Sequence, residues 1–119
     1  MKSIKNASLV LNNIVFANNS YELNSTSYEE LNKLVTYLSE NGSFKVEISA
    51  HTDDSGGESY NLQLSNLRAN SVLEYLQDNS ITRERLVSRG YGEERPLFPN
   101  NTDENKAKNR RVEFKILTE

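Results

Sequence analysis

Residues 51–72, HTDDSGGESYNLQLSNLRANSV, decide the fold and point to the site. They follow residues 44–50, where apolar and polar side chains alternate as in a half-buried strand. Residues 51–57 have the polar, glycine-rich composition of a loop. Residues 58–78 carry one apolar stripe at helical spacing, and Asn79-Ser80 is expected to end this helix. The segment therefore predicts a strand, a loop and a long helix in succession.

Two charged residues of this segment are expected to face one cleft. Asp53 lies just past the strand, on the loop that leads into the helix, and Arg68 lies ten residues into the helix. Asn61, Leu64 and Arg68 are spaced i, i+3 and i+7, so they share one helix face. Such a pair can clamp a zwitterion, because the carboxylate takes an ammonium and the guanidinium takes a carboxylate. Backbone N–H groups at the helix start can hold a second anionic group.

Both charged residues also have structural interpretations. Asp53 can cap backbone donors ahead of the helix. Arg68 can form a surface salt bridge with Asp53 or with Glu74, which by itself contributes little to stability. Ligand binding and a salt bridge are compatible roles for Arg68, because Asp53 and Arg68 can pair with each other when no ligand is bound.

The chain before this segment predicts one strand and one helix. Residues 8–16 are rich in aliphatic and β-branched side chains and read as a first strand, and 17–25 form a polar loop. Ser27 and Glu30 have the spacing of a capping box, and a leucine-rich apolar stripe follows them. Asn41-Gly42 is expected to supply the left-handed residue that ends this helix.

The chain after this segment completes the predicted sheet. Residues 86–91 and 112–116 read as strands. Residues 92–103 form a loop with two prolines, and a short helical turn is expected over 104–108. The order is β-α-β-α-β-β, and two helices with one apolar stripe each can cover one face of a small mixed four-stranded sheet. We therefore expect an α+β fold.

Composition limits the classes of function. The chain has 119 residues, enough for a single domain (1–119), and carries a net charge of -3. An acidic balance argues against nucleic acid as a partner, because binding to phosphates depends on surplus lysine and arginine. There is no cysteine, which excludes disulfides, thiol nucleophiles and zinc-thiolate sites. No apolar run approaches the length of a membrane span, so no direct membrane insertion is expected of this domain.

Neither a metal site nor a cofactor is predicted. His51 is the chain's single histidine, so a two-histidine metal site is excluded, and a packed or hydrogen-bonded role is favoured. The acids Asp53, Asp54 and Glu58 do not have the spacing of a calcium-binding loop. Gly90 and Gly92 flank a tyrosine and indicate close backbone packing or turn geometry.

Several motifs in fixed order together resemble a known family. The pattern HTD-x-x-G-x-x-x-x-N-x-x-L-S-x-x-R-A-x-x-V over 51–72, R-G-Y-G-E at 89–93 and N-R-R-V-E-F at 109–114 are similar to the OmpA-like C-terminal domain. Peptidoglycan-associated lipoproteins and stator proteins of the MotB type share that domain. The resemblance covers residues 14–117 and implies a β-α-β-α-β-β sandwich with its helices on one face of the sheet.

The resemblance also implies a ligand and its contacts. The family binds peptidoglycan through the diaminopimelate residue of the stem peptide, and its ligand pair corresponds to Asp53 and Arg68. Its asparagine corresponds to Asn61, which can bind the ligand or pin the loop. Its first-strand phenylalanine corresponds to Phe16, and the backbone near Ala17 is a further contact. Thr52 and Leu64 complete the expected ligand site, with Arg89 and Arg110 as secondary candidates.

Two departures from the family pattern are visible. Ala17-Asn18-Asn19 stands where the family often has an aspartate after the phenylalanine, and Asn105-Lys106 stands where it commonly has Gly-Arg. Neither departure touches Asp53 or Arg68.

The function that the resemblance implies is non-covalent anchoring of an outer-membrane or envelope protein to the cell wall. The domain would be non-catalytic, need no cofactor, act in the periplasm and be excised from a longer envelope protein. One alternative is a module for protein interaction, including a weak homodimer. Another is a cell-wall hydrolase that uses acids such as Asp53 or Glu93 with His51 as base, although the sequence offers no nucleophile–base–orienter set.

Overall fold

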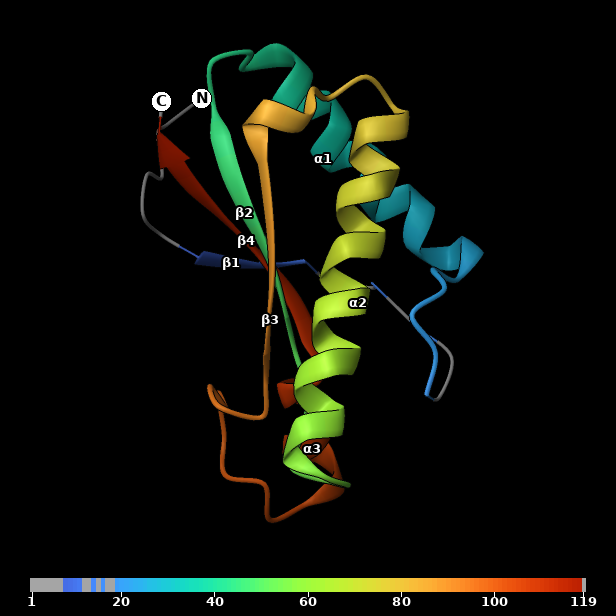
Figure 1. The fold of residues 1–119 in the computed structure, drawn as a ribbon, viewed down its shortest axis with the longest axis vertical. Coiled ribbons are helices and arrows are strands. Elements are labelled where there is room, and N and C mark those ends of the chain that lie inside the picture. Colours follow the sequence, from blue (N-terminus) through green and yellow to red (C-terminus); the bar gives the residue numbers. More distant parts are fainter. Residues whose placement is uncertain (1–7, 12–13, 15, 17–18, 119) are drawn as a thin grey trace.

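The computed structural model describes residues 8–11, 14, 16 and 19–118, which form a four-stranded sheet with its two long helices on one face (Figure 1). The strands are β1 (Ser8–Leu11), β2 (Lys45–His51), β3 (Leu86–Gly92) and β4 (Arg111–Thr118). The helices are α1 (Tyr28–Glu40), α2 (Glu58–Asp78) and α3 (Asp103–Asn109), and short 3-10 turns occupy Ser25–Ser27 and Arg83–Arg85.

The sheet is mixed, with strand order β1-β4-β2-β3. β2 and β3 are parallel and are joined through α2, as a parallel pair requires a crossover connection. β4 runs antiparallel to both β1 and β2. The predicted α+β class and mixed four-stranded sheet are therefore confirmed.

The core lies between the sheet and the two long helices. Alternate residues of the central strands, such as Val46, Ile48 and Ile116, are fully buried. They meet the apolar stripes predicted for the helices, of which Leu31, Leu38, Leu73 and Leu76 are buried. Burial of this apolar surface is the main favourable contribution to folding.

Two glycines let α2 approach the edge strand β3. A Cβ atom on Gly90 would lie 2.1 Å from the backbone nitrogen of Asn66, and Gly92 has a left-handed φ of 57°. The N–H groups of these glycines donate to side chains of α2. Asn66 Oδ1 accepts from Gly90 at 2.7 Å, and Ser65 Oγ accepts from Gly92 at 2.9 Å. The predicted close packing is confirmed.

The ends of α1 differ from the prediction. Ser27 closes a 3-10 turn and already has helical angles (φ −77°, ψ −21°), so it makes no capping hydrogen bond to α1. A capping residue needs extended angles, and the expected capping box is therefore wrong. At the other end neither Asn41 nor Gly42 is left-handed. Instead Arg85 Nη2 donates to the carbonyls of Leu38 and Asn41, both at 2.8 Å.

The first strand is shorter than the predicted 8–16. β1 covers Ser8–Leu11, residues 12, 13 and 15 lie outside the described residues, and Phe16 forms an isolated antiparallel bridge with Leu23. The short turn expected over 104–108 is a full helix, because Thr102 caps it by accepting from the Asn105 N–H at 3.0 Å.

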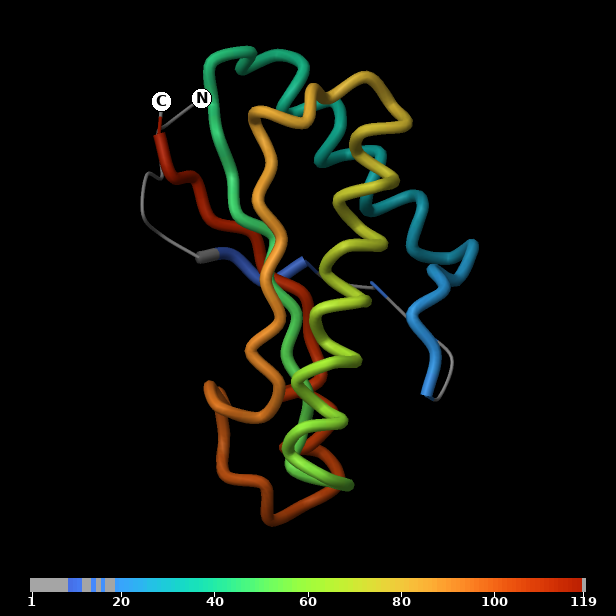
Figure 2. Tube along the Cα trace, viewed as in Figure 1, coloured from blue at the N-terminus to red at the C-terminus, as the bar shows by residue number. Residues whose placement is uncertain are grey.

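The carboxyl ends of β2 and β3, the start of α2, the loop 93–102 and α3 gather at one end of the molecule (Figure 2). The crossover topology imposes this arrangement, because parallel strands end at the same edge of a sheet. Asp53 and its neighbours lie there.

Candidate functional site

Asp53 is buried and ionic. Its residue surface is 7% exposed, its Oδ1 accepts the Ser55 N–H at 2.8 Å, and its Oδ2 pairs with the Arg110 guanidinium. Desolvation by burial raises the pKa of this carboxyl, but the hydrogen bonds from Ser55 and Arg110 outweigh it, and the pKa is lowered from its ordinary value. Asp53 therefore stays ionised at neutral pH.

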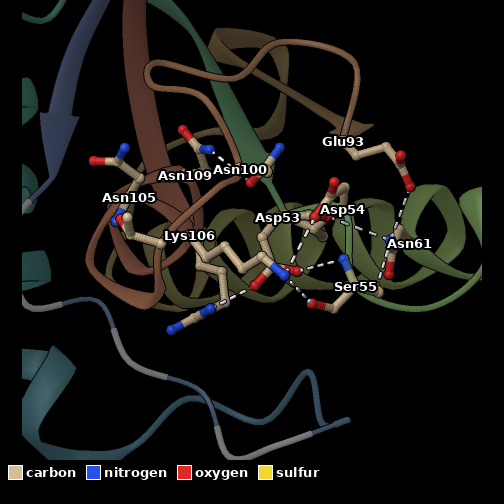
Figure 3. Close-up of polar contacts among 12 residues, drawn as sticks. Asp53, Asp54, Ser55, Asn61, Glu93, Asn100, Asn105, Lys106 and Asn109 are labelled. Atoms are coloured by element: carbon tan, nitrogen blue, oxygen red, sulfur yellow. Dashed lines mark hydrogen bonds and ion pairs between the residues drawn. The ribbon is translucent and has the colours of Figure 1, made fainter.

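Asn61 pins the loop that carries Asp53. Its side-chain Nδ2 donates to the Ser55 carbonyl at 3.0 Å and to Glu93 Oε1 at 3.1 Å, with a longer contact of 3.4 Å to the Asp53 carbonyl (Figure 3). Asn61 is 4% exposed and lies in the first turn of α2. Of its two predicted roles, loop pinning is the one that the structure shows.

Arg68 is held between a backbone carbonyl and an aromatic ring. Its Nε donates to the Ser20 carbonyl at 2.8 Å, and its guanidinium carbon lies 4.9 Å from the centre of the Phe16 ring. Burial lowers the pKa of Arg68, as does nearby Arg110, whereas Tyr60 acts to raise it. A guanidinium remains protonated in proteins, so Arg68 presents a partly desolvated positive charge.

Asp53, Asn61 and Arg68 border one cavity, and a second cavity adjoins it and shares Arg68 and Arg110 with it. The first has a volume of about 550 Å³, and its lining is mostly polar. The second, of about 380 Å³, contains Phe16 and other apolar residues. Two guanidinium groups and one carboxylate therefore face the same space, which suits a ligand with one cationic and one or more anionic groups.

The structure brings together most of the predicted site residues. The first cavity is lined by Thr52, Asp53, Asn61, Leu64, Arg68 and Arg110. Phe16 lines the second cavity, and Ala17 lies outside the described residues. Arg89 is exposed on β3, lies over the Tyr91 ring and borders neither cavity.

The expected closed pair of Asp53 with Arg68 is replaced by a pair of Asp53 with Arg110. Arg110 follows α3 directly and comes from the far end of the chain, so no local spacing could relate it to Asp53. Arg110 was predicted as a secondary candidate, and the structure places it at the first cavity.

Sequence reasoning missed several residues of the first cavity. Tyr60 donates its hydroxyl to Asn19 Oδ1 at 3.0 Å and lines the cavity with Asn19. Tyr60 stands at i−8 from Arg68, with Leu64 between them, so the helix periodicity already placed it on the same face. Lys106 Nζ lies 3.7 Å from Asp54 Oδ1, so this lysine supports the loop after β2.

Asn109 organises the loop beyond β3. It is fully buried, its Oδ1 accepts from the N–H groups of Leu97 and Phe98, and its Nδ2 donates to Phe98 O and Asn100 Oδ1. Figure 3 shows this contact between Asn109 and Asn100. Arg110 follows Asn109 directly, so this network helps to fix the backbone from which the Arg110 side chain reaches Asp53.

His51 packs within the sheet. Its ring stacks on Tyr91 with 5.3 Å between centres, and its Nε2 lies 3.2 Å from Ser49 Oγ. Desolvation lowers the pKa of His51 to about 4, with a further lowering from Arg111 and Arg95 and an opposing effect of Glu113. Within the described part of the chain, no group of three His, Asp or Glu side chains could hold a metal ion.

A mixed sheet backed by two helices, with a charged cavity at the carboxyl ends of its parallel strands, defines an α+β domain with a candidate ligand site. Residues 15–110 match the model of the OmpA family, and the chain belongs to that family.

Relatives and solved structures agree with this placement. The peptidoglycan-associated lipoprotein of Buchnera aphidicola is 33% identical over 100 residues, which cover 84% of this chain and 58% of the relative. The peptidoglycan-binding protein ArfA of Mycobacterium tuberculosis is 35% identical over 103 residues, which cover 87% of this chain and 32% of ArfA. The crystal structure of a MotB-like protein from Desulfovibrio vulgaris superposes with a TM-score of 0.84 at 35% identity, covering 94% of this chain and 73% of that one.

The chain spans 13%, 58% and 28% of the lengths of the first three curated relatives that it matches. Within the described residues, none of the helices combines the length and apolar character needed to cross a membrane.

Proposed function

We propose that this domain binds peptidoglycan non-covalently, through the zwitterionic end of the diaminopimelate residue in the stem peptide. The observation that carries the proposal is the first cavity, where one ionised carboxylate and two guanidinium groups face the same space. The names of two relatives, a peptidoglycan-associated lipoprotein and a peptidoglycan-binding protein, support the choice of ligand.

Each charged group has a separate part in this binding. The ligand ammonium bonds to Asp53, whose lowered pKa keeps the carboxylate available. The ligand carboxylate bonds to Arg68, which the Ser20 carbonyl and the Phe16 ring hold in place. Arg110 bonds to Asp53 Oδ2, and when the ligand binds, other N–H groups of the same guanidinium bond to the ligand carboxylate.

In this proposal the domain anchors a longer envelope protein to the cell wall from the periplasm, and breaks no bond. Only reversible contacts are required, because hydrogen bonds and ion pairs hold both charged groups of the ligand. The lengths of the relatives are consistent with a module that occurs within larger proteins.

Calorimetric titration tests the proposal. A stem peptide with diaminopimelate should bind saturably, whereas a matched peptide with lysine should bind weakly because it lacks the second carboxylate. Asp53→Asn and Arg68→Gln should each weaken binding about tenfold or more, since each leaves one charged group of the ligand without its partner. Amidation of the diaminopimelate carboxylate should reproduce the effect of Arg68→Gln.

Two substitutions outside the site are matched controls. Glu84→Gln removes an acid in the 3-10 turn Arg83–Arg85, and Arg89→Gln removes an arginine on β3, and neither residue borders the two cavities. Both should leave the affinity unchanged. Equal binding of the two peptides, or unchanged binding by a folded Arg68→Gln protein, would contradict the proposed clamp. New reducing ends or free amines from wall fragments would instead indicate a hydrolase, and a dimer in sedimentation would favour an interaction module.

A further inference from the structure

We propose a second binding surface, for an arginine-bearing segment of a partner protein, on the outer side of α2. It is a shallow groove of about 370 Å³ between the second half of α2, the loop 21–23 and the start of α1. We call it the tyrosine groove, and its lining includes three tyrosines and three acids: Tyr21, Tyr28, Tyr75, Glu22, Glu74 and Asp78.

The tyrosine rings of the groove are partly exposed, and neighbouring side chains hold two of them in place. Tyr28 and Tyr75 stack with 5.1 Å between ring centres and 10° between ring planes. The Tyr75 hydroxyl donates to Asn32 Oδ1 at 2.6 Å, which fixes this stack against α1. Tyr21 is 49% exposed and Tyr28 is 40% exposed. Ring faces carry negative electrostatic potential, so fixed and exposed rings attract a flat cation at little cost in entropy.

The charge of the groove is complementary to the same cation. Glu22, Glu74 and Asp78 line it, and neither lysine nor arginine occurs among its described lining residues. Glu74 and Asp78 stand one helical turn apart on α2, so their carboxylates lie on the same side. An arginine suits both features, because its guanidinium stacks on aromatic rings and bonds carboxylates in pairs.

The shape of the groove favours a polypeptide over a small ion. The groove is open along the helix and has no enclosed chamber or group of metal ligands in the described chain. A bare cation would remain hydrated there, whereas a peptide can lay its backbone along the surface and insert one side chain between ring and carboxylate. The groove shares no lining residue with the two cavities around Arg68, so the proposal does not rest on wall binding.

Nuclear magnetic resonance of the full chain tests the proposal. The probe is acetyl-Arg-Gly-Arg-amide, with acetyl-Gln-Gly-Gln-amide as the neutral peptide. We expect saturable shifts of the backbone amides at 21–23, 28 and 71–78 with the first peptide and none with the second. Glu74→Gln combined with Asp78→Asn should weaken the binding about fivefold or more, and Tyr21→Leu should weaken it without loss of fold.

The control has the same change in charge at a distant place. Asp103→Asn combined with Glu104→Gln alters the first turn of α3, outside the groove, and should leave the affinity for the arginine peptide unchanged. An equal loss in this control would show diffuse attraction to an acidic protein and would overturn the proposal. Absence of saturable shifts, shifts confined to the Arg68 cavities, or self-association abolished by the groove substitutions would overturn it as well.

Discussion

At the scale of single residues, Asp53 shows how far a charged site can be predicted from the sequence. Its place after a strand and its pairing with a cationic partner were both predicted, and the surrounding contacts explain why the carboxyl stays ionised. The partner was misjudged, because Arg110 lies 57 residues further along the chain and reaches Asp53 only in the folded structure. Local spacing predicts which residues share one helix face, whereas contacts between distant parts of the chain can be seen only in the folded structure.

His51 leads to a prediction about stability and pH. Its pKa is about 4 in the folded chain and about 6.5 when unfolded. Between these values only the unfolded chain binds the proton, so stability falls as the pH decreases. From about pH 7.5 to about pH 5 we expect a loss of about 2 kcal/mol in the free energy of unfolding, measured with urea.

His51→Asn is the matched variant for this measurement. It removes the titrating ring, so the pH dependence over this interval should largely disappear, whatever the overall change in stability. Asp53 does not interfere, because a carboxyl with a lowered pKa loses its contribution only when the pH falls below its ordinary range. The same slope in the variant and in the parent protein would disprove the assignment to His51.

At the scale of elements, periodicity predicted the helices and strands well, and it predicted both ends of α2, whereas the capping of α1 was predicted wrongly. The buried stripes of α1 and α2 are those that the spacing gave, since apolar burial drives both the pattern and the packing. The end of α1 depends on a distant partner instead. Arg85 closes α1 from a 3-10 turn that lies more than 40 residues along the chain, and no local motif could indicate it.

Gly90 provides the prediction for the contact between α2 and β3. In Gly90→Ala the new Cβ would meet the α2 backbone at 2.1 Å, and a helix backbone cannot give way as a flexible side chain can. We expect a loss of about 3 kcal/mol or more in the free energy of unfolding. Gly42→Ala is the control, because nothing lies within 4 Å of its Cβ position and its φ is not left-handed. Similar losses in the two variants would show that the close approach is not what matters at position 90.

At the scale of the whole molecule, α2 connects the two proposed ligand surfaces. One of its faces holds the loop around residues 19–21, because Tyr60 donates to Asn19, Arg68 to the Ser20 carbonyl and Ser71 to the Tyr21 carbonyl. That loop borders the first cavity at Asn19 and the tyrosine groove at Tyr21. The polar composition of the loop predicted only that it lacks regular structure, since its position is set by side chains that lie about 40 to 50 residues further along the chain.

The last prediction follows from this shared loop. Ser71 borders neither cavity around Arg68, yet its hydroxyl donates to the Tyr21 carbonyl at 2.6 Å, one residue from the carbonyl that holds Arg68. Ser71→Ala should release the loop, lower the free energy of unfolding by about 1 kcal/mol and weaken binding of the diaminopimelate peptide by about two- to tenfold. Calorimetry on Ser71→Ala and on the neighbouring Asn70→Ala measures the effect, because Asn70 bonds to Glu74 and not to the loop. Unchanged affinity in Ser71→Ala would mean that Arg68 is positioned by the Ser20 carbonyl and the Phe16 ring without the help of the rest of the loop, and an equal loss in Asn70→Ala would place the effect in α2 itself.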